Sequence, residues 1–207
     1  MNHGLRALGF LAALTFALPA ASDCEHRGNK SADIDASGAD KLVIDVGAGD
    51  LVVTGSTATP QVHARGEACA DSQKLLDAIR IDTRRDGNTL FLTAVMPEDK
   101  SIMQQASLDL TIELPAGLAV EIDDSSGDIE VRKVAAAKIS DSSGDQSIRD
   151  VDGDVSVADS SGDIRIQGVR GNLTVRDSSG DIGVTHHRER HDSGRQLGRD
   201  VATTRSW

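Results

Sequence analysis

The chain has 207 residues and a formal net charge of −11, with 33 acidic side chains against 22 Lys and Arg. This acidic balance disfavours binding to nucleic acid or to an anionic lipid surface, because both are themselves negatively charged. Aromatic residues make up 2% of the chain and tyrosine is absent, so the sequence offers few stacking platforms for sugars or bases.

The first 22 residues have the pattern of a secretory signal. Arg6 supplies the positive charge, residues 7–18 form an apolar run that is too short to cross a bilayer, and residues 19–22 are small or Pro, as near a cleavage site. We therefore expect a signal peptide over 1–22, no transmembrane helix, and a protein exported to the periplasm, the cell surface or the medium.

Two cysteines, Cys24 and Cys69, lie in the exported part. An even number of cysteines in an oxidising compartment favours a disulfide, which would close a loop of about 45 residues and stabilise the fold by about 3–4 kcal/mol in the chain-entropy description. Two free thiols or a metal pair are the alternative. Lipidation of Cys24 is a further alternative, which Asp23 disfavours because a small residue is needed just before a lipidated cysteine.

Residues 23–39 are polar and are expected to form a flexible lead-in. A short helix is expected over 70–79, with Asp71 as its N-cap, and 85–88 has the composition of a hairpin turn. Strand-like runs occupy 42–46, 50–54, 61–65, 79–83, 89–94, 107–114 and 118–122. We interpret 40–122 as irregular β coils continuous with the repeats that follow, and a separate β domain is the alternative.

A hexapeptide frame, Asp-Ser-Ser-Gly-Asp followed by Ile or Gln, occurs four times, at 124–129, 141–146, 159–164 and 177–182. The spacings are 17, 18 and 18 residues. Glycines also recur every nine residues from Gly144 to Gly180, and most open a Gly-Asp/Asn-apolar-x-apolar run. Each nine-residue half then supplies one short strand and one corner.

This period predicts an all-β chain folded as a β-solenoid, with about 18 residues per regular coil. Stacked coils would form aliphatic columns inside, and Val134, Val151 and Val169 would fill a corner column. We expect the solenoid over 40–185, with its regular repeats over 123–185. An ordinary β-sandwich with similar turns is the alternative.

The frame also predicts two columns of stacked aspartates. One contains Asp124, Asp141, Asp159 and Asp177, and the other contains Asp128, Asp145, Asp163 and Asp181. Like charges about 4.8 Å apart repel by roughly 1 kcal/mol in a water-like dielectric, so something must relieve the repulsion. Calcium is one candidate, with Asp128, Asp145, Asp163 and Asp181 as ligands. The alternative is that these side chains form hydrogen bonds at the corners and that their charges are solvated.

No catalytic residue or other cofactor site is predicted. The repeated serines have no histidine within the array to act as a base, and four equivalent Ser-Ser pairs are typical of architecture. His187 and His191 have the i, i+4 spacing of helical metal ligands, but no apolar face accompanies them.

Residues 186–207 break the repeat pattern. They are locally basic, show no alternation and do not resemble a polar cap, so we expect a disordered or aberrant tail. A reading-frame shift near codon 185 is one hypothesis. Translation of the other frames would then show the repeats resuming.

The Ser-Ser-Gly-Asp-Ile-x-Val repeats, preceded by Leu-Pro-Ala-Gly-Leu-Ala-Val-Glu-Ile at 114–122, resemble the bacterial putative-adhesin family of β-strand repeat proteins, a domain of unknown function. The resemblance covers 40–185 and implies an exported β-solenoid with an adhesin-like role and no established catalytic residue. We therefore expect a non-enzymatic protein whose acidic repeat surface binds an unidentified protein, envelope or matrix component. A polysaccharide-acting enzyme on a β-helix scaffold is the alternative.

Overall fold

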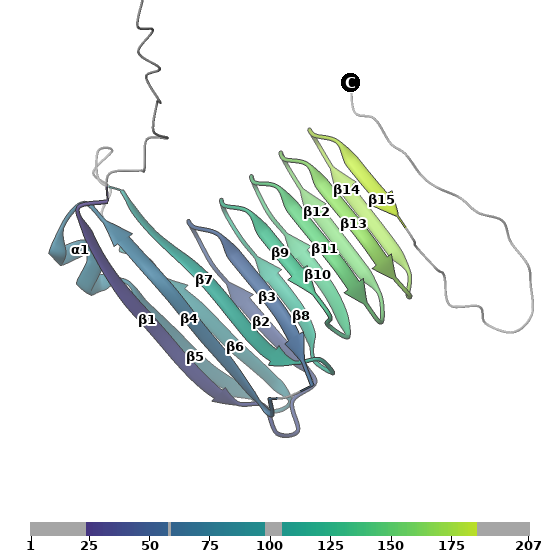
Figure 1. The fold of residues 1–207 in the computed structure, drawn as a ribbon, viewed down its shortest axis with the longest axis horizontal. Coiled ribbons are helices and arrows are strands. Elements are labelled where there is room, and N and C mark those ends of the chain that lie inside the picture. Colours follow the sequence, from purple (N-terminus) through teal and green to yellow (C-terminus); the bar gives the residue numbers. More distant parts are fainter. Residues whose placement is uncertain (1–23, 58, 98–104, 186–207) are drawn as a thin grey trace, which may run out of the picture.

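The computed structural model describes residues 24–57, 59–97 and 105–185, most of them in strands of two facing sheets (Figure 1). The predictions about the signal peptide over 1–22, the tail over 186–207 with its frameshift hypothesis, and His187 and His191 lie outside the described residues. No helix among the described residues is both long and apolar enough to span a membrane.

The first sheet, called sheet A, has eight strands. In spatial order they are β1 (His26–Asp35), β4 (Gln61–Ala70), β7 (Ala106–Pro115), β3 (Leu51–Ser56), β9 (Ile129–Arg132), β11 (Gln146–Val151), β13 (Ile164–Val169) and β15 (Ile182–Thr185). The second, sheet B, has seven. They are β14 (Leu173–Asp177), β12 (Val155–Asp159), β10 (Ala136–Ser140), β8 (Ala119–Asp123), β2 (Lys41–Asp45), β6 (Thr89–Val95) and β5 (Arg80–Asp86).

The regular repeats form the predicted solenoid. Each coil contributes one strand to sheet A and one to sheet B, and a strand pairs in parallel with its copy in the next coil, as Ile148 pairs with Ile166 and Ile166 with Val184. Inward residues of both sheets form one aliphatic core. The corner column of Val134, Val151 and Val169 is buried as expected, with at most 1% of each residue exposed.

Residues 40–122 continue the same two sheets as the regular repeats. Strand β3 pairs in parallel with β9, and β2 pairs in parallel with β8, so the irregular coils join the regular ones without a break. The predicted hairpin turn connects β5 to β6, which are antiparallel, with Gly87 in the left-handed region at φ 57°.

The prediction of a flexible lead-in over 23–39 is wrong for most of that segment. Residues 26–35 form β1, which pairs antiparallel with β4 along its whole length. Its composition misleads because β1 is an edge strand with alternate side chains in solvent, and only Ala32 and Ile34 pack against the core.

Helix α1 (Gln73–Ala78) lies at the same end of the molecule and covers a second, smaller apolar cluster that includes Leu75, Leu76 and Leu108. The expected N-cap is corrected by one residue. Ser72, not Asp71, accepts the backbone N–H of Leu75 through its Oγ, at 3.3 Å. The side chain of Asp71 instead accepts the N–H of Gln105.

The disulfide between Cys24 and Cys69 is present, with Cα atoms 5.7 Å apart. Because Cys69 belongs to β4, the bond fastens the start of β1 to the strand with which β1 pairs. The N-terminal end of the solenoid is therefore closed by antiparallel strands, by α1 and by a covalent link (Figure 1).

Candidate functional site

The first aspartate of each repeat frame shapes the corner, and it is buried in the first three frames and half-buried in the fourth. We call Asp124, Asp141, Asp159 and Asp177 the inner aspartate column. In Asp124 the Oδ1 atom accepts the backbone N–H groups of Ser125 and Ser126, at 2.7 and 3.3 Å. Asp141 and Asp159 repeat this arrangement, and Asp177 accepts the N–H of Ser179. The Asp-Ser-Ser sequence is thus explained by a local turn in which the carboxylate satisfies two backbone donors.

The second carboxylate oxygen, Oδ2, lacks a hydrogen-bond donor in most members of the inner column. Oδ2 is buried without a hydrogen-bond partner in Asp124, Asp159 and Asp177. Burial raises the pKa of Asp124 to about 6, against the opposing effect of the serine N–H groups, and also raises the pKa values of Asp141 and Asp159. Asp124, Asp141 and Asp159 therefore favour the protonated, neutral carboxyl more than an ordinary aspartate does.

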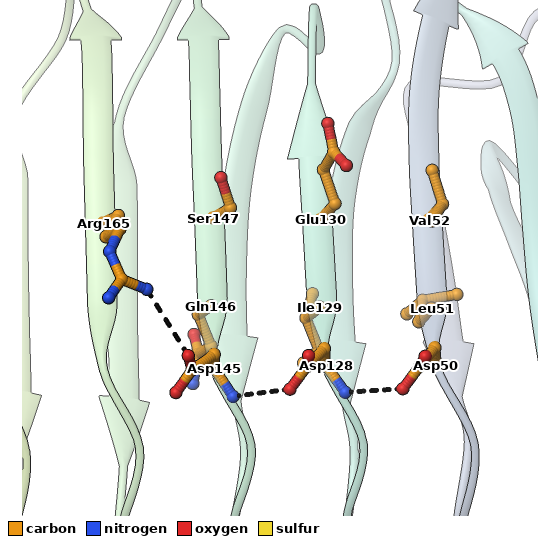
Figure 2. A pocket seen from close by; sticks show the side chains of 10 residues that line it. All are labelled: Asp50, Leu51, Val52, Asp128, Ile129, Glu130, Asp145, Gln146, Ser147 and Arg165. Atoms are coloured by element: carbon orange, nitrogen blue, oxygen red, sulfur yellow. Dashed lines mark hydrogen bonds and ion pairs between the residues drawn. The ribbon is translucent and has the colours of Figure 1, made fainter. Parts of the chain in front are cut away.

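The second aspartate of each frame is exposed and joins successive coils. In the outer aspartate ladder each Oδ1 accepts the backbone N–H of the next member, at 3.0 or 3.1 Å. Its members, in spatial order, are Asp109, Asp50, Asp128, Asp145, Asp163 and Asp181. Figure 2 shows the Asp50, Asp128 and Asp145 steps side by side. Each carboxylate from Asp109 to Asp163 therefore uses one oxygen to hold the stack together.

The second oxygen of each ladder carboxylate lies on the exposed side. Arg165 contacts two of these oxygens, Oδ2 of Asp163 at 2.9 Å and Oδ2 of Asp145 at 3.4 Å. The N–H of Asp163, followed by Arg165, holds the pKa of Asp145 below its usual range. One arginine thus relieves part of the charge repulsion that the sequence predicted along this column.

A shallow groove of about 370 Å³ runs beside the ladder on sheet A. The polar and charged residues that line it are Asp50, Asp128, Asp145, Glu130, Gln146, Ser147 and Arg165 (Figure 2). The hydroxyl of Ser147 is buried and has no hydrogen-bond partner. Four carboxylates against one guanidinium make the groove negative, which suits the ammonium or guanidinium groups of a ligand.

The structure brings the four predicted calcium candidates, Asp128, Asp145, Asp163 and Asp181, into one column. Within 24–57, 59–97 and 105–185, however, no three carboxylate, histidine or cysteine side chains converge as the ligands of a metal ion would. Calcium binding by the ladder stays a prediction.

The sequence did not lead us to predict four residues of this surface, which are Asp50, Asp109, Glu130 and Arg165. Asp50 had a visible signal, since Gly49-Asp50-Leu51-Val52-Val53 repeats the Gly-Asp-apolar frame. Asp109 had none, because Leu108 stands where the frame has glycine. The outward alternation of β13 placed Arg165 on the same face, two residues after Asp163, but its distance to Asp145 depends on the stacking of coils.

A match to a known protein family shows to which family the chain belongs. Residues 72–194, more than half of the chain, match the family described as Toastrack DUF4097. The chain belongs to this family. The predicted resemblance to a putative-adhesin repeat family of unknown function is confirmed, as is the all-β solenoid fold.

The Toastrack protein is also similar to several solved structures. A putative cell adhesion protein from Clostridium sporogenes aligns with a TM-score of 0.51 at 11% identity, covering 80% of this chain and 100% of that one. A putative adhesin from Parabacteroides distasonis aligns with a TM-score of 0.36 at 12% identity, over 79% and 96% of the two chains. A putative lipid binding protein from the same species has a TM-score of 0.29 at 13% identity, over 80% and 94%. No curated protein matches the chain.

Proposed function

We propose that this Toastrack protein is an exported, adhesin-like and non-enzymatic binding protein, and that its outer aspartate ladder contacts a protein or envelope component. The observation that carries the proposal is the geometry of the ladder. Each carboxylate from Asp109 to Asp163 accepts one backbone N–H of the next coil, while Asp50 and Asp128 keep the other oxygen without a protein partner among the described residues. The fold thereby presents fixed negative charges at regular spacing.

Export is supported by the Cys24–Cys69 disulfide. Structural disulfides persist in the periplasm and outside the cell and are rare in reducing compartments. The pairing of β1 with β4 and the disulfide together hold residues 24–35 against the body of the protein, as suits a protein exposed to an extracellular environment.

Binding fits the groove better than glycan cleavage. Glycosidases need a carboxylic acid that holds its proton near neutral pH beside a second, ionised carboxylate. Of the carboxyls that line the groove, Asp145 has a pKa shifted downward, which favours the ionised form. The carboxyls with raised pKa values, Asp124, Asp141 and Asp159, are buried in the inner column and do not line the groove.

The test neutralises the ladder without breaking it. In the triple variant Asp50→Asn, Asp128→Asn, Asp145→Asn, each amide oxygen still accepts the N–H of the next coil while three charges are removed. We expect labelled variant protein to bind an immobilised envelope preparation of the source cells at least about tenfold more weakly than wild type, since several charge contacts are lost together.

A matched control separates the ladder from net charge. The triple variant Asp45→Asn, Asp123→Asn, Asp150→Asn changes the charge equally at exposed positions outside the ladder. It should bind like wild type. Equal losses in both triples would reduce the effect to overall charge, and unchanged binding of the ladder triple would refute the proposed contact. Turnover of any member of a glycan panel by the purified protein would instead favour the enzyme hypothesis.

Calcium has an independent test. If the free ladder oxygens bind the ion, millimolar calcium should raise the melting temperature of wild type by a few degrees over chelator, and the ladder triple should lose this response. A melting temperature that is the same in calcium and in chelator would remove calcium from the description of this protein.

A further inference from the structure

The two ends of the solenoid are protected differently. At the N-terminal end the edge strands are β1 and β5, and both carry charged side chains along their length, as natural edge strands do to prevent pairing with other chains. At the C-terminal end the edge strands are β14 and β15. Strand β15 reads Ile-Gly-Val-Thr and carries no charge.

Within the described part of the chain, the core is also open at its C-terminal end. Leu173, Val175, Ile182 and Val184 point inward but are only partly buried. Their equivalents one coil earlier are 0–2% exposed, and these are Val155, Val157, Ile164 and Ile166. A coil in this architecture buries its apolar face only when a neighbour stacks on both sides, so the last described coil lacks one neighbour.

The outer strand edges of the last described coil likewise lack partners among the described residues. Within the described parts of the chain, nothing pairs with the outer edges of β14 and β15. The ladder stops at Asp181, whose own N–H is donated to Asp163, while no described residue donates an N–H to the carboxylate of Asp181. Exposed, flat and apolar strand edges are templates for pairing.

We propose that the end coil, residues 173–185, is an interface at which a second copy of this chain docks end to end about a twofold axis. In this arrangement β14 pairs antiparallel with the partner's β14, and β15 pairs antiparallel with the partner's β15. The inference depends on the fold and is independent of the proposed binding function of the ladder.

A second copy is the occupant that fits the geometry. The end presents two strand edges, one per sheet, with the apolar columns between them, and a single extended peptide could pair with only one of these edges. Another end coil has two edges at the same separation. The charged N-terminal end does not provide such a surface, so the contact closes at a dimer and does not continue into a fibre.

Charge placement also favours the twofold arrangement. Antiparallel pairing puts Asp181, which precedes β15, near the far end of the partner's strand, so the two outer ladders lie at opposite sides of the contact. The strand residues that meet in sheet A are uncharged. The aliphatic columns of the two copies would become continuous across the contact, with their last members buried.

The test measures the mass of the mature chain, residues 23–207, by light scattering and sedimentation over a range of concentrations. We expect a dimer. The variant Gly183→Lys should become monomeric, with a dissociation constant at least tenfold higher, because it places a like charge from each copy at the contact. A side chain at Gly183 points into open space, since the nearest atom to its Cβ would be the carbonyl oxygen of Ile164 at 3.9 Å. The fold should therefore survive, as circular dichroism would verify.

The control adds the same charge to the other end. Thr83→Lys lies on the exposed edge strand β5 and should leave the dimer intact. Amide exchange of residues 182–185 should also accelerate on dilution of wild type, as the interface opens. A wild-type chain that is monomeric throughout would overturn the proposal, whether β15 is then unprotected or covered by residues 186–207. A dimer that persists in Gly183→Lys and also in Ile182→Lys would overturn it as well.

Discussion

At the scale of single residues, the same amino acid plays two physical roles in one repeat. The first aspartate of the frame is 4–7% exposed in Asp124, Asp141 and Asp159, and its burial favours the neutral form. The second aspartate is exposed, and in Asp145 a backbone N–H and an arginine favour the ionised form. Four residues of sequence thus separate a structural carboxyl from a surface charge.

The buried carboxyls give stability a defined pH dependence. A raised pKa in the folded state means that the contribution of Asp124 is fully present below its unfolded pKa, near 4, and is lost as pH rises through about 6. Glu121, whose pKa is lowered by Lys138 and then by Lys41, has the opposite effect, because its contribution is lost only as pH falls.

Asp124→Asn should therefore raise the free energy of unfolding at pH 7.5, by about 1–3 kcal/mol, and change it little at pH 4. The amide oxygen still accepts the N–H groups of Ser125 and Ser126, while no charge is buried. Urea unfolding at both pH values measures the difference. Asp45→Asn is the control, because it removes an exposed carboxylate that is not among the charges that raise the pKa of Asp124. It should show no such pH-dependent gain, and a loss at pH 7.5 in Asp124→Asn would contradict the role of burial.

At the scale of elements, the repeat unit is a strand followed by a corner that only glycine permits. Gly127, Gly144, Gly162 and Gly180 have φ between 129° and 147°. A Cβ atom on any of the last three would overlap the carbonyl oxygen of the glycine one coil before. The close approach of backbone to backbone, added to the positive φ, explains why glycine occupies this position in all four copies of the frame.

Gly162→Ala should consequently destabilise the protein by roughly 2–4 kcal/mol, since both φ and the space above Gly144 exclude a side chain. Gly117→Ala is the matched control, because nothing lies within 4 Å of its Cβ and its φ is not positive. Thermal or urea unfolding compares the two. A control as unstable as Gly162→Ala would show that the corner is not the cause.

Gln146 is the exception among the inward residues of the repeats. It occupies the column position of Ile129 and Ile164 and is 1% exposed, yet its Oε1 has no hydrogen-bond partner. Its Nε2 donates to Oδ2 of Asp141 at 3.4 Å, which provides that buried carboxylate with a donor that other members of the inner column lack. The one polar residue at this inward position thus donates a hydrogen bond to the inner aspartate column.

At the scale of the whole molecule, stability is distributed along an axis. Each coil contacts its neighbours, so the two ends decide whether the array is closed. The N-terminal end is closed by β1, α1 and the disulfide, whereas the C-terminal end coil is open within the described residues.

Removal of the Cys24–Cys69 disulfide tests how much this bond stabilises the N-terminal end of the solenoid. Cys24→Ala with Cys69→Ala should lower the free energy of unfolding by about 3–4 kcal/mol, because the unfolded chain regains the freedom of a 45-residue loop. Urea unfolding measures the loss. Reductant should reproduce it in wild type and have no effect on the double variant; an unchanged stability would mean that pairing of β1 with β4 alone secures this end.

The sequence by itself determined the repeating half of this protein. Period, corner residues and alternation are local properties, so the frame at 124–182 predicted the parallel coils, the aliphatic columns and the two stacks of aspartates before any contact was known. The cysteine count likewise predicted the bond between Cys24 and Cys69.

Only the tertiary structure decided which of the two aspartate stacks is buried, which further residues extend the exposed stack, and how the ends of the solenoid are closed. The pairing of β1 with β4 places His26 opposite Ala70, and the ladder bond between Asp109 and Asp50 joins residues that are 59 positions apart. Neither contact follows from a local period of the sequence. A short sequence pattern specifies the backbone of a coil, whereas burial and charge contacts depend on which coil is stacked against it.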